Sequence, residues 1–213
     1  SELWVRLDVD VLEEKLKDSG EPQVSTTDAD ARALLVQGQV VEVSYNIQAA
    51  VDDKHNLVVA THTINRNDKN ALSAIAIEVK ENLEVETFTV LVDKGYHNGR
   101  EIEICKQNNI TTIVAHPDQG KSNENGTQPE YFVSKFTYNK EQNTYTCPQG
   151  QALTTTGSWH KKTGRTDQSG YQFQKYRTPA CKTCPVKDLC TSRKGGREID
   201  RSQYADAVEE NLK

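Results

Sequence analysis

The segment Thr-Phe-Thr-Val-Leu-Val-Asp-Lys-Gly-Tyr at residues 87–96 decides the fold class. Its first six residues form a continuous apolar and β-branched run, which is typical of a strand buried on both faces. Residues 110–115 repeat this pattern. The stretch between them predicts a helix that begins near Asn98 and turns Cys105 toward the core as a small buried side chain. Strand, helix and strand in this order predict an α/β fold with a partly parallel sheet.

Upstream segments complete the expected core. Residues 40–50 and 57–64 are rich in β-branched side chains and flank a polar turn that contains Asp52, so they predict a β-hairpin. From residue 72 to residue 83, apolar side chains recur every three or four positions, which predicts an amphipathic helix. Two further helices are predicted nearer the start, one within residues 3–16 and a short one at residues 33–36.

Composition limits the class of protein. The chain has 213 residues, of which 27% are charged and 35% hydrophobic, and its mean hydropathy is -0.75. This favours a soluble protein with enough chain for one domain plus an inserted module. No apolar run approaches the roughly 20 residues that cross a bilayer, and no signal peptide is evident. We therefore expect a cytoplasmic protein with no membrane partner.

Charge is distributed unevenly along the chain. The net charge of -5 at neutral pH hides an acidic part, residues 1–116 at -9, and a basic part, residues 117–199 at +6. A basic half can approach phosphate, whereas a lysine-rich solvated surface would explain the same charge without a partner.

Four of the five cysteines form a pattern typical of a metal site. Cys181 and Cys184 are two residues apart, Cys190 follows them, and Cys147 precedes a Pro-Gln-Gly turn on a predicted hairpin around residues 139–143. Four thiolates predict a structural, closed zinc site that would stabilise an otherwise polar segment. The alternative is four free thiols in a loop-rich insertion.

Cations and aromatic side chains alternate around these cysteines, which suits phosphate contact and base stacking. Aromatic residues on a small metal module are as often its core. The candidate DNA contacts are Lys161, Lys162, Arg165, Lys175, Arg177, Arg193 and Lys194, with Trp159, His160, Tyr171, Phe173 and Tyr176 among them.

Two carboxylates are candidate ligands for a hard cation. Asp93 follows the predicted strand at residues 87–92, and the carboxyl end of such a strand is where ligands bind in open α/β sheets. Asp93 can equally be a cap or turn residue. Asp52 is a weaker candidate, because Asp52-Asp53 before Lys54 suits a hairpin turn.

Several motifs together resemble the transposases of bacterial insertion sequences that use an Asp-Asp-Glu (DDE) triad on an RNase H-like fold. They are Thr-Asp-Ala-Asp-Ala-Arg at 27–32, Tyr-Asn-Ile-Gln-Ala-Ala-Val-Asp at 45–52, Val-Asp-Lys-Gly-Tyr at 92–96, Tyr-Thr-Cys-Pro at 145–148 and the later cysteines. The resemblance covers most of the chain.

The resemblance implies that Asp93 is the second carboxylate of the triad and binds Mg²⁺ or Mn²⁺. Two metal ions held by three carboxylates would activate water and then a 3′-hydroxyl for attack on phosphodiester bonds at the element ends. The implied partner is double-stranded DNA, both element ends and target. A homo-oligomer in the active complex and association with the bacterial nucleoid are implied as well.

The other two triad members are not placed. We expect no strand that carries the first Asp within residues 1–40, and we expect Arg201, Tyr204, Glu209 and Glu210 on a terminal helix. The sequence is therefore interpreted as an internal fragment, inactive in isolation. Its expected parts are an N-terminal helix and linker (1–39), a partial RNase H-like catalytic core (40–117), a linker (118–133), a β-rich zinc-binding insertion (134–197) and the start of a C-terminal helix (198–213).

Two other functions fit the same residues. One is a noncatalytic, zinc-stabilised module that binds nucleic acid, such as a transposase remnant, in which Asp93 is only a turn residue. The other is a metal-dependent nuclease on the same fold, which would cut DNA without joining strands.

Overall fold

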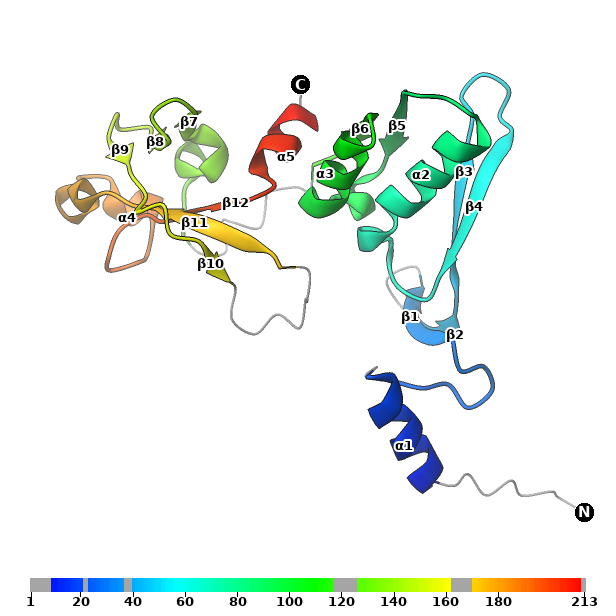
Figure 1. Cartoon of the computed structure of the whole chain (residues 1–213). Coiled ribbons are helices and arrows are strands. Elements are labelled where there is room, and N and C mark those ends of the chain that lie inside the picture. The colour runs from blue at the N-terminus through cyan, green and yellow to red at the C-terminus, as the bar shows by residue number, and fades with distance from the viewer. Residues whose placement is uncertain (1–8, 21–22, 37–39, 117–125, 162–169, 212–213) are drawn as a thin grey trace, which may run out of the picture. The chain divides into compact units, whose positions relative to one another are not determined.

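The computed structural model describes residues 9–20, 23–36, 40–116, 126–161 and 170–211. The chain divides into two compact units, Ser1–Ala115 and His116–Lys213. Figure 1 shows the elements of each unit.

The first unit begins with helix α1 (Val9–Ser19), which ends before Gly20. Gly20 adopts a φ of 64°, a left-handed conformation that is common just after a helix. This confirms the predicted amphipathic helix from residue 9 onward, while residues 3–8 lie outside the described residues.

The next element corrects a prediction. Residues 33–36 belong to strand β1 (Arg32–Val36), not to a short helix, and β1 pairs antiparallel with β2 (Val40–Ser44). Pairing with the β-branched residues of β2 outweighs the local helical tendency of Ala-Leu-Leu, because strand preference depends on cross-strand neighbours. β1 contains no Asp, so it is not a strand that could carry the first Asp of the triad.

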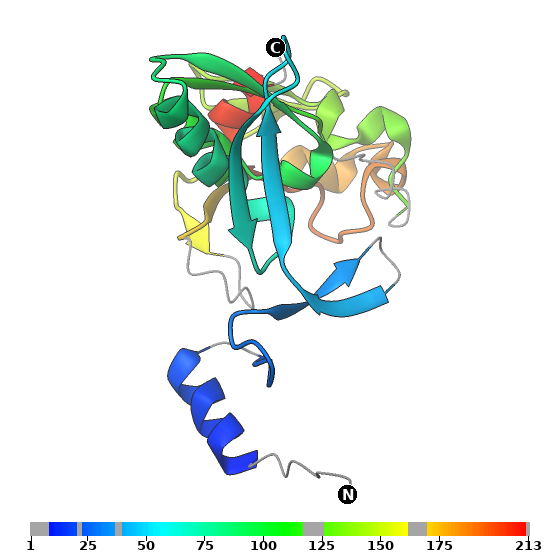
Figure 2. The same ribbon diagram turned by 90° about the vertical axis from the view of Figure 1, so that its right-hand side faces the viewer.

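The predicted hairpin is confirmed over β3 (Asn46–Val51) and β4 (Val58–Ile64), which pair antiparallel. Figure 2 shows β2 leading directly into this hairpin. Its turn requires a left-handed residue, and Asn56 provides it with a φ of 57°.

Helix α2 (Leu72–Asn82) covers one face of this hairpin, as the apolar repeat predicts. Ile75 and Val79 pack on Ala60 of β4, and Phe88 packs at the edge of the same cluster. Burying an aliphatic side chain contributes about 1.5–3 kcal/mol, so this cluster holds helix and hairpin together.

The parallel portion of the fold is confirmed. Strand β5 (Phe88–Val92) pairs in parallel with β6 (Ile110–Val114), and helix α3 (Gly99–Gln107) connects them. Cys105 is fully buried on α3, as expected. However, β5 is not buried on both faces, since Leu91 is 76% exposed. Side chains alternate along a strand, and no described element of the first unit covers the face that carries Leu91.

The first unit is therefore mixed α/β, as predicted. Its described strands form three two-stranded sheets: β1–β2, β3–β4 and β5–β6. A single RNase H-like sheet stays a prediction.

The second unit contains two three-stranded sheets. One is β7 (Thr137–Asn139), β8 (Thr144–Thr146) and β9 (Ala152–Leu153), and the other is β10 (His160–Lys161), β11 (Gln172–Tyr176) and β12 (Ile199–Ser202). An antiparallel bridge between Thr154 and Arg177 joins them. Short helices complete the unit: η4 (Pro129–Tyr131), η5 (Val133–Lys135), η6 (Pro179–Thr183), α4 (Lys187–Cys190) and α5 (Ala205–Asn211).

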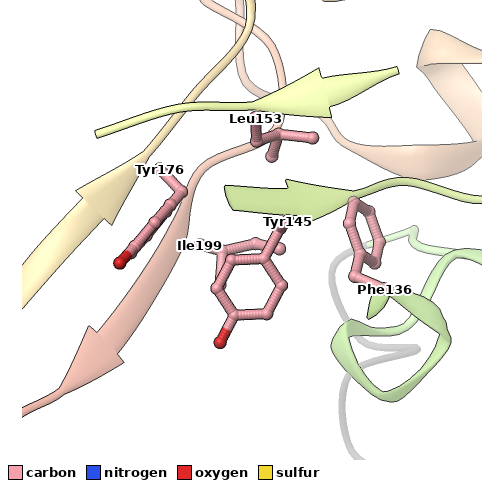
Figure 3. Close-up of a cluster of buried hydrophobic side chains, with 5 residues drawn as sticks. All are labelled: Phe136, Tyr145, Leu153, Tyr176 and Ile199. Atoms are coloured by element: carbon pink, nitrogen blue, oxygen red, sulfur yellow. The ribbon is translucent and has the colours of Figure 1, made fainter. Parts of the chain in front are cut away.

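Aromatic side chains form the core of this unit. The cluster in Figure 3 consists of Phe136, Tyr145, Leu153, Tyr176 and Ile199, drawn from both sheets and the turn before β7. Tyr145 and Tyr176 meet edge to face with ring centroids 5.0 Å apart. Of the aromatics considered for base stacking, Tyr176 and Phe173 are thus core residues, whereas Trp159 is exposed.

The end of the unit differs from expectation. Arg201 lies on strand β12, and Tyr204 precedes α5, so only Glu209 and Glu210 of the four residues expected on the terminal helix are on it. Residue 201 is drawn into a strand because β12 pairs with β11, placing Arg201 opposite Gln174.

Candidate functional site

Asp93 lies directly after β5, at the carboxyl end of the parallel pair. It is also the N-cap of the short helix η2 (Lys94–Tyr96), where its Oδ1 accepts a hydrogen bond from the Gly95 backbone N at 2.7 Å. The side chain is exposed. Asp93 therefore lies where α/β sheets bind ligands and also caps η2. Its Oδ1 makes the capping hydrogen bond, and its Oδ2 can coordinate a cation.

Asp68 is a carboxylate that the sequence analysis did not consider. It starts the short helix η1 (Asp68–Asn70), which precedes α2. Its Oδ1 accepts hydrogen bonds from Asn46 Nδ2 at 2.7 Å and from Gln48 Nε2 at 3.0 Å. Both donors lie on β3, so the hairpin fixes the position of this carboxylate.

Asp68 and Asp93 meet beside Gly95. A Cβ built on Gly95 would lie 2.9 Å from Asp93 Oδ1 and 3.3 Å from Asp68 Oδ2. The two oxygens are thus no more than about 6 Å apart. Tyr96 is close enough to sense both: burial, and then the charges of Asp68 and Asp93, raise its pKa.

Asp52 is not brought to this place. It follows the last residue of β3, whereas Asn46, the partner of Asp68, is the first. A six-residue strand separates its ends by roughly 20 Å. Asp52 accepts hydrogen bonds from the backbone N of Leu57 at 2.7 Å and of His55 at 2.8 Å, which lower its pKa and build the hairpin turn.

The four cysteines of the second unit line one pocket. Cys147 follows β8, Cys181 belongs to η6, Cys184 ends it, and Cys190 ends α4. The pocket has a volume of ≈ 30 Å³, room for one or two water-sized occupants. The turn after Cys147 aims the Gln151 backbone N at its Sγ, at 3.3 Å.

The thiols influence one another electrostatically. Burial is the main cause that raises the pKa of Cys190, and the neighbouring Cys181, Cys147 and Cys184 raise it further, while Arg197 lowers it. Among the described residues, however, no group of three or more His, Cys, Asp or Glu side chains is already arranged around a metal position. The donor set and the pocket size fit one zinc ion, but the sulfurs would have to close in on it.

Three of the candidate DNA contacts surround one carboxylate. Lys175 Nζ and Arg193 Nη1 lie 2.7 and 2.8 Å from Glu198 Oε1, and Arg177 pairs with Oε2. The Glu198 side chain is only 6% exposed, whereas both arginines are about 60% exposed. Burial alone would raise the pKa of Glu198, but these cations outweigh it and lower the pKa to about 2. Three cations around one anion leave a net positive surface.

The remaining candidates are distributed differently. Lys161 and Lys194 are exposed, and Lys162 and Arg165 lie outside the described residues. Arg201, by contrast, is buried within the unit, where its guanidinium lies 3.6 Å from the ring centroid of Tyr138 and pairs with Asp206 and Glu209.

Sequence reasoning missed Asp68, Gln48 and Glu198. Asp68 sits in an Asn-Asp pair before a predicted helix, a pattern that ordinarily indicates a cap. Gln48 lies within the Tyr-Asn-Ile-Gln-Ala-Ala-Val-Asp stretch at 45–52, which is one of the motifs that resemble the transposases but does not by itself assign a role to Gln48.

Comparison with known proteins gives one match, which lies in the second unit. Residues 146–213 match the family described as Transposase DDE domain, so this part of the chain is similar to that family. No curated protein and no solved structure matches the chain. Among the described helices, none is long and apolar enough to cross a membrane.

Proposed function

We propose that the chain is part of a DNA transposase that catalyses metal-dependent phosphodiester hydrolysis and strand transfer at insertion-sequence ends. The observation that carries this proposal is the match of residues 146–213 to a transposase DDE domain. The placement of Asp93 at the carboxyl end of β5 supports it, since ligands of α/β sheets bind at that end.

Asp93 is the proposed metal-binding carboxylate of the triad. A bound Mg²⁺ or Mn²⁺ would activate the attacking water or 3′-hydroxyl and stabilise charge on the phosphate. The backbone N of Gly95 orients Asp93 through Oδ1, and the exposure of the side chain leaves room for a DNA phosphate. An RNase H-like sheet, a homo-oligomeric active complex and a location at the bacterial nucleoid belong to the same proposal.

The test is a strand-transfer assay with the complete protein that contains this chain. The DNA substrate carries the sequences that flank the gene on both sides, and Mn²⁺ or Mg²⁺ is added or withheld. We expect metal-dependent cleavage and joining that Asp93→Asn abolishes and Asp52→Asn does not. Cleavage without joining would support a nuclease, and metal-independent DNA binding without cleavage would support a noncatalytic module.

For the second unit we propose a structural zinc ion held by Cys147, Cys181, Cys184 and Cys190. The convergence of the four thiols on one small pocket carries this proposal. The site would lie against the aromatic core, because Cys147 and Cys190 pack on the cluster of Figure 3. Arg197 also lines the pocket and would offset the negative charge of a four-thiolate site.

Metal analysis of the purified protein tests the zinc proposal. We expect one zinc per chain, and after exchange for Co²⁺ the visible absorption of a tetrahedral thiolate site. Cys184→Ser should abolish that absorption, whereas Cys105→Ser should retain it, because Cys105 is buried in the other unit. A Co²⁺ spectrum unchanged by Cys184→Ser would refute the assignment.

DNA contact by the basic surface of this unit is the third element of the proposal. Arg177 and Arg193 are paired with Glu198 but remain mostly exposed, so their guanidinium groups can reach a phosphate as well. Lys161, Lys194, Lys162, Arg165 and Lys175 are the other proposed contacts.

A further inference from the structure

Gly95 lies beside two carboxylates. An added Cβ there would be in contact with Asp93 Oδ1 at 2.9 Å and with Asp68 Oδ2 at 3.3 Å. The Cβ position itself is one covalent bond from Cα and cannot hold an ion, but the two distances show that both oxygens lie beside Gly95 and no more than about 6 Å apart. Oxygen ligands lie about 2.0–2.6 Å from Mg²⁺ or Ca²⁺, so one ion can bind both carboxylates once side-chain rotation brings their oxygens to within about 5 Å of each other.

Gln48 provides an independent sign of a missing ligand. It is 2% exposed, and its amide is directed at Asp68, with Nε2 donating to Asp68 Oδ1 and to Asn46 Oδ1. These two bonds assign the other amide atom as Oε1, which is buried and has no hydrogen-bond partner among the described residues. A buried oxygen without a donor is rare in folded proteins. A water bound to a cation beside Asp68 would supply that donor.

In the part of the chain that the structure describes, neutral groups donate the hydrogen bonds that fix the two carboxylates. Asp68 is held by the neutral amides of Asn46 and Gln48, and Asp93 by the backbone N of Gly95. Neutral donors orient a carboxylate without cancelling its charge. Two anions within about 6 Å repel each other, and a divalent cation between them would remove this cost.

We infer that Asp68 and Asp93 together bind one divalent cation beside Gly95, with Asn46 and Gln48 holding Asp68 in place. This inference rests on the proposed function, because it adds a second carboxylate of this chain to the proposed metal site at Asp93. Asp68 takes the place beside Asp93 for which Asp52 was a candidate. Elements far apart in sequence, β3, η1 and η2, thereby become parts of one site.

The site explains why residue 95 is glycine. Its φ is not in the left-handed range, so an alanine would meet no backbone strain there. The cost of a side chain would come from its close contact with the two carboxylates. Gly95→Ala is therefore a probe of the cation site that removes no ligand.

Mn²⁺ binding to the purified chain tests the inference without any catalytic readout. Free Mn²⁺ is followed by its electron paramagnetic resonance signal in a titration of wild type, Asp68→Asn, Asp93→Asn, Gly95→Ala and Asp52→Asn. We expect the wild type to bind Mn²⁺ and each of the first three variants to weaken binding by about tenfold or more. Asp52→Asn, a matched loss of one carboxylate, should bind like wild type.

Two further measurements keep the result interpretable. Asp68→Glu retains a carboxylate and should keep part of the affinity that Asp68→Asn loses, and circular dichroism verifies that each variant is folded. Manganese soaked into crystals should give an anomalous peak between Asp68 and Asp93.

Three outcomes would overturn the inference. They are no Mn²⁺ binding by the folded wild-type chain, wild-type affinity in Asp68→Asn, or a manganese peak elsewhere. None of these decides the proposed function, which depends on the loss of strand transfer in Asp93→Asn. Conversely, Mn²⁺ binding at both carboxylates in a protein without strand-transfer activity would retain the cation site and reject the transposase.

Discussion

Gly196 approaches Cys181 so closely that a side chain at residue 196 would collide with it. A Cβ on Gly196 would lie 2.3 Å from Cys181 Cβ and 3.2 Å from Cys181 Sγ. Gly196 is buried and has a φ of 91°, a conformation that other residues rarely adopt. The loop before β12 can therefore press its backbone against a proposed zinc ligand only because residue 196 is glycine.

Gly196→Ala should destabilise the second unit and weaken zinc binding. The positive φ costs about 1–3 kcal/mol, and the collision must displace Cys181 in addition. Urea unfolding and competition with a zinc chelator measure the two effects. Gly157→Ala is the matched control, since Gly157 has a φ of 78° and nothing within 4 Å of an added Cβ. Equal effects of both substitutions on zinc affinity would contradict the role of the contact.

Arg201→Met should cost about 2 kcal/mol or more of unfolding free energy. Arg201 is 7% exposed, stacks on Tyr138, donates to Tyr145 Oη at 3.0 Å and pairs with Asp206 and Glu209. Methionine fills similar space but leaves a tyrosine oxygen and two carboxylates without their cation. Thermal or urea unfolding measures the loss.

Two further variants test which property of Arg201 stabilises this cluster. Arg201→Lys keeps the charge but cannot reproduce the planar fork, so it should recover only part of the loss. Lys140→Met removes the exposed cation from the same Asp206 and should change stability little. A large effect of Lys140→Met would show that Asp206, and not the buried arginine, governs this cluster.

Glu198→Gln should lower stability at neutral pH by about 1–2 kcal/mol, because three cations lose their shared anion. The pKa of Glu198 is lowered to about 2, from an ordinary value of 4.5. A lowered pKa stabilises the fold fully above the ordinary value and loses this contribution as the pH falls from 4.5 toward about 2. Urea unfolding at neutral and at acidic pH should show the difference between wild type and variant shrinking in acid. A difference that grows in acid would contradict the ion-pair explanation.

Much of the first unit was predictable because its elements are defined by local periodicity. The parallel pair β5–β6, the helices α2 and α3 and the hairpin β3–β4 all follow from apolar spacing and turn residues. The strand β1 was not predictable in this way, because Ala-Leu-Leu-Val is compatible with both helix and strand. Only its pairing with β2 makes it a strand. The exposure of Leu91 could not be predicted either, because a continuous apolar run does not show which faces of the strand other elements cover.

The sequence predicted only those candidate site residues whose type and position indicate their chemistry. The four cysteines and Asp93 stand out by type and by position after a strand. Asp68 does not, because it shares its local pattern with any helix cap, and its neighbour Asp93 is brought to it by tertiary structure alone. Arg201 was assigned to a helix for a related reason: its strand forms by pairing with β11, which is distant in sequence.

Glu198→Gln should also raise the affinity of the protein for double-stranded DNA. Glu198 holds Lys175, Arg177 and Arg193, and its neutralisation leaves all three free to contact phosphates. Fluorescence anisotropy across a salt series should then show tighter binding and a salt dependence steeper by about one unit of slope. Asp200→Asn is the control, because it makes the same charge change two residues away, at an exposed position of β12. Equal gains in both variants would assign the effect to net charge, and no gain in either would place the DNA contact elsewhere.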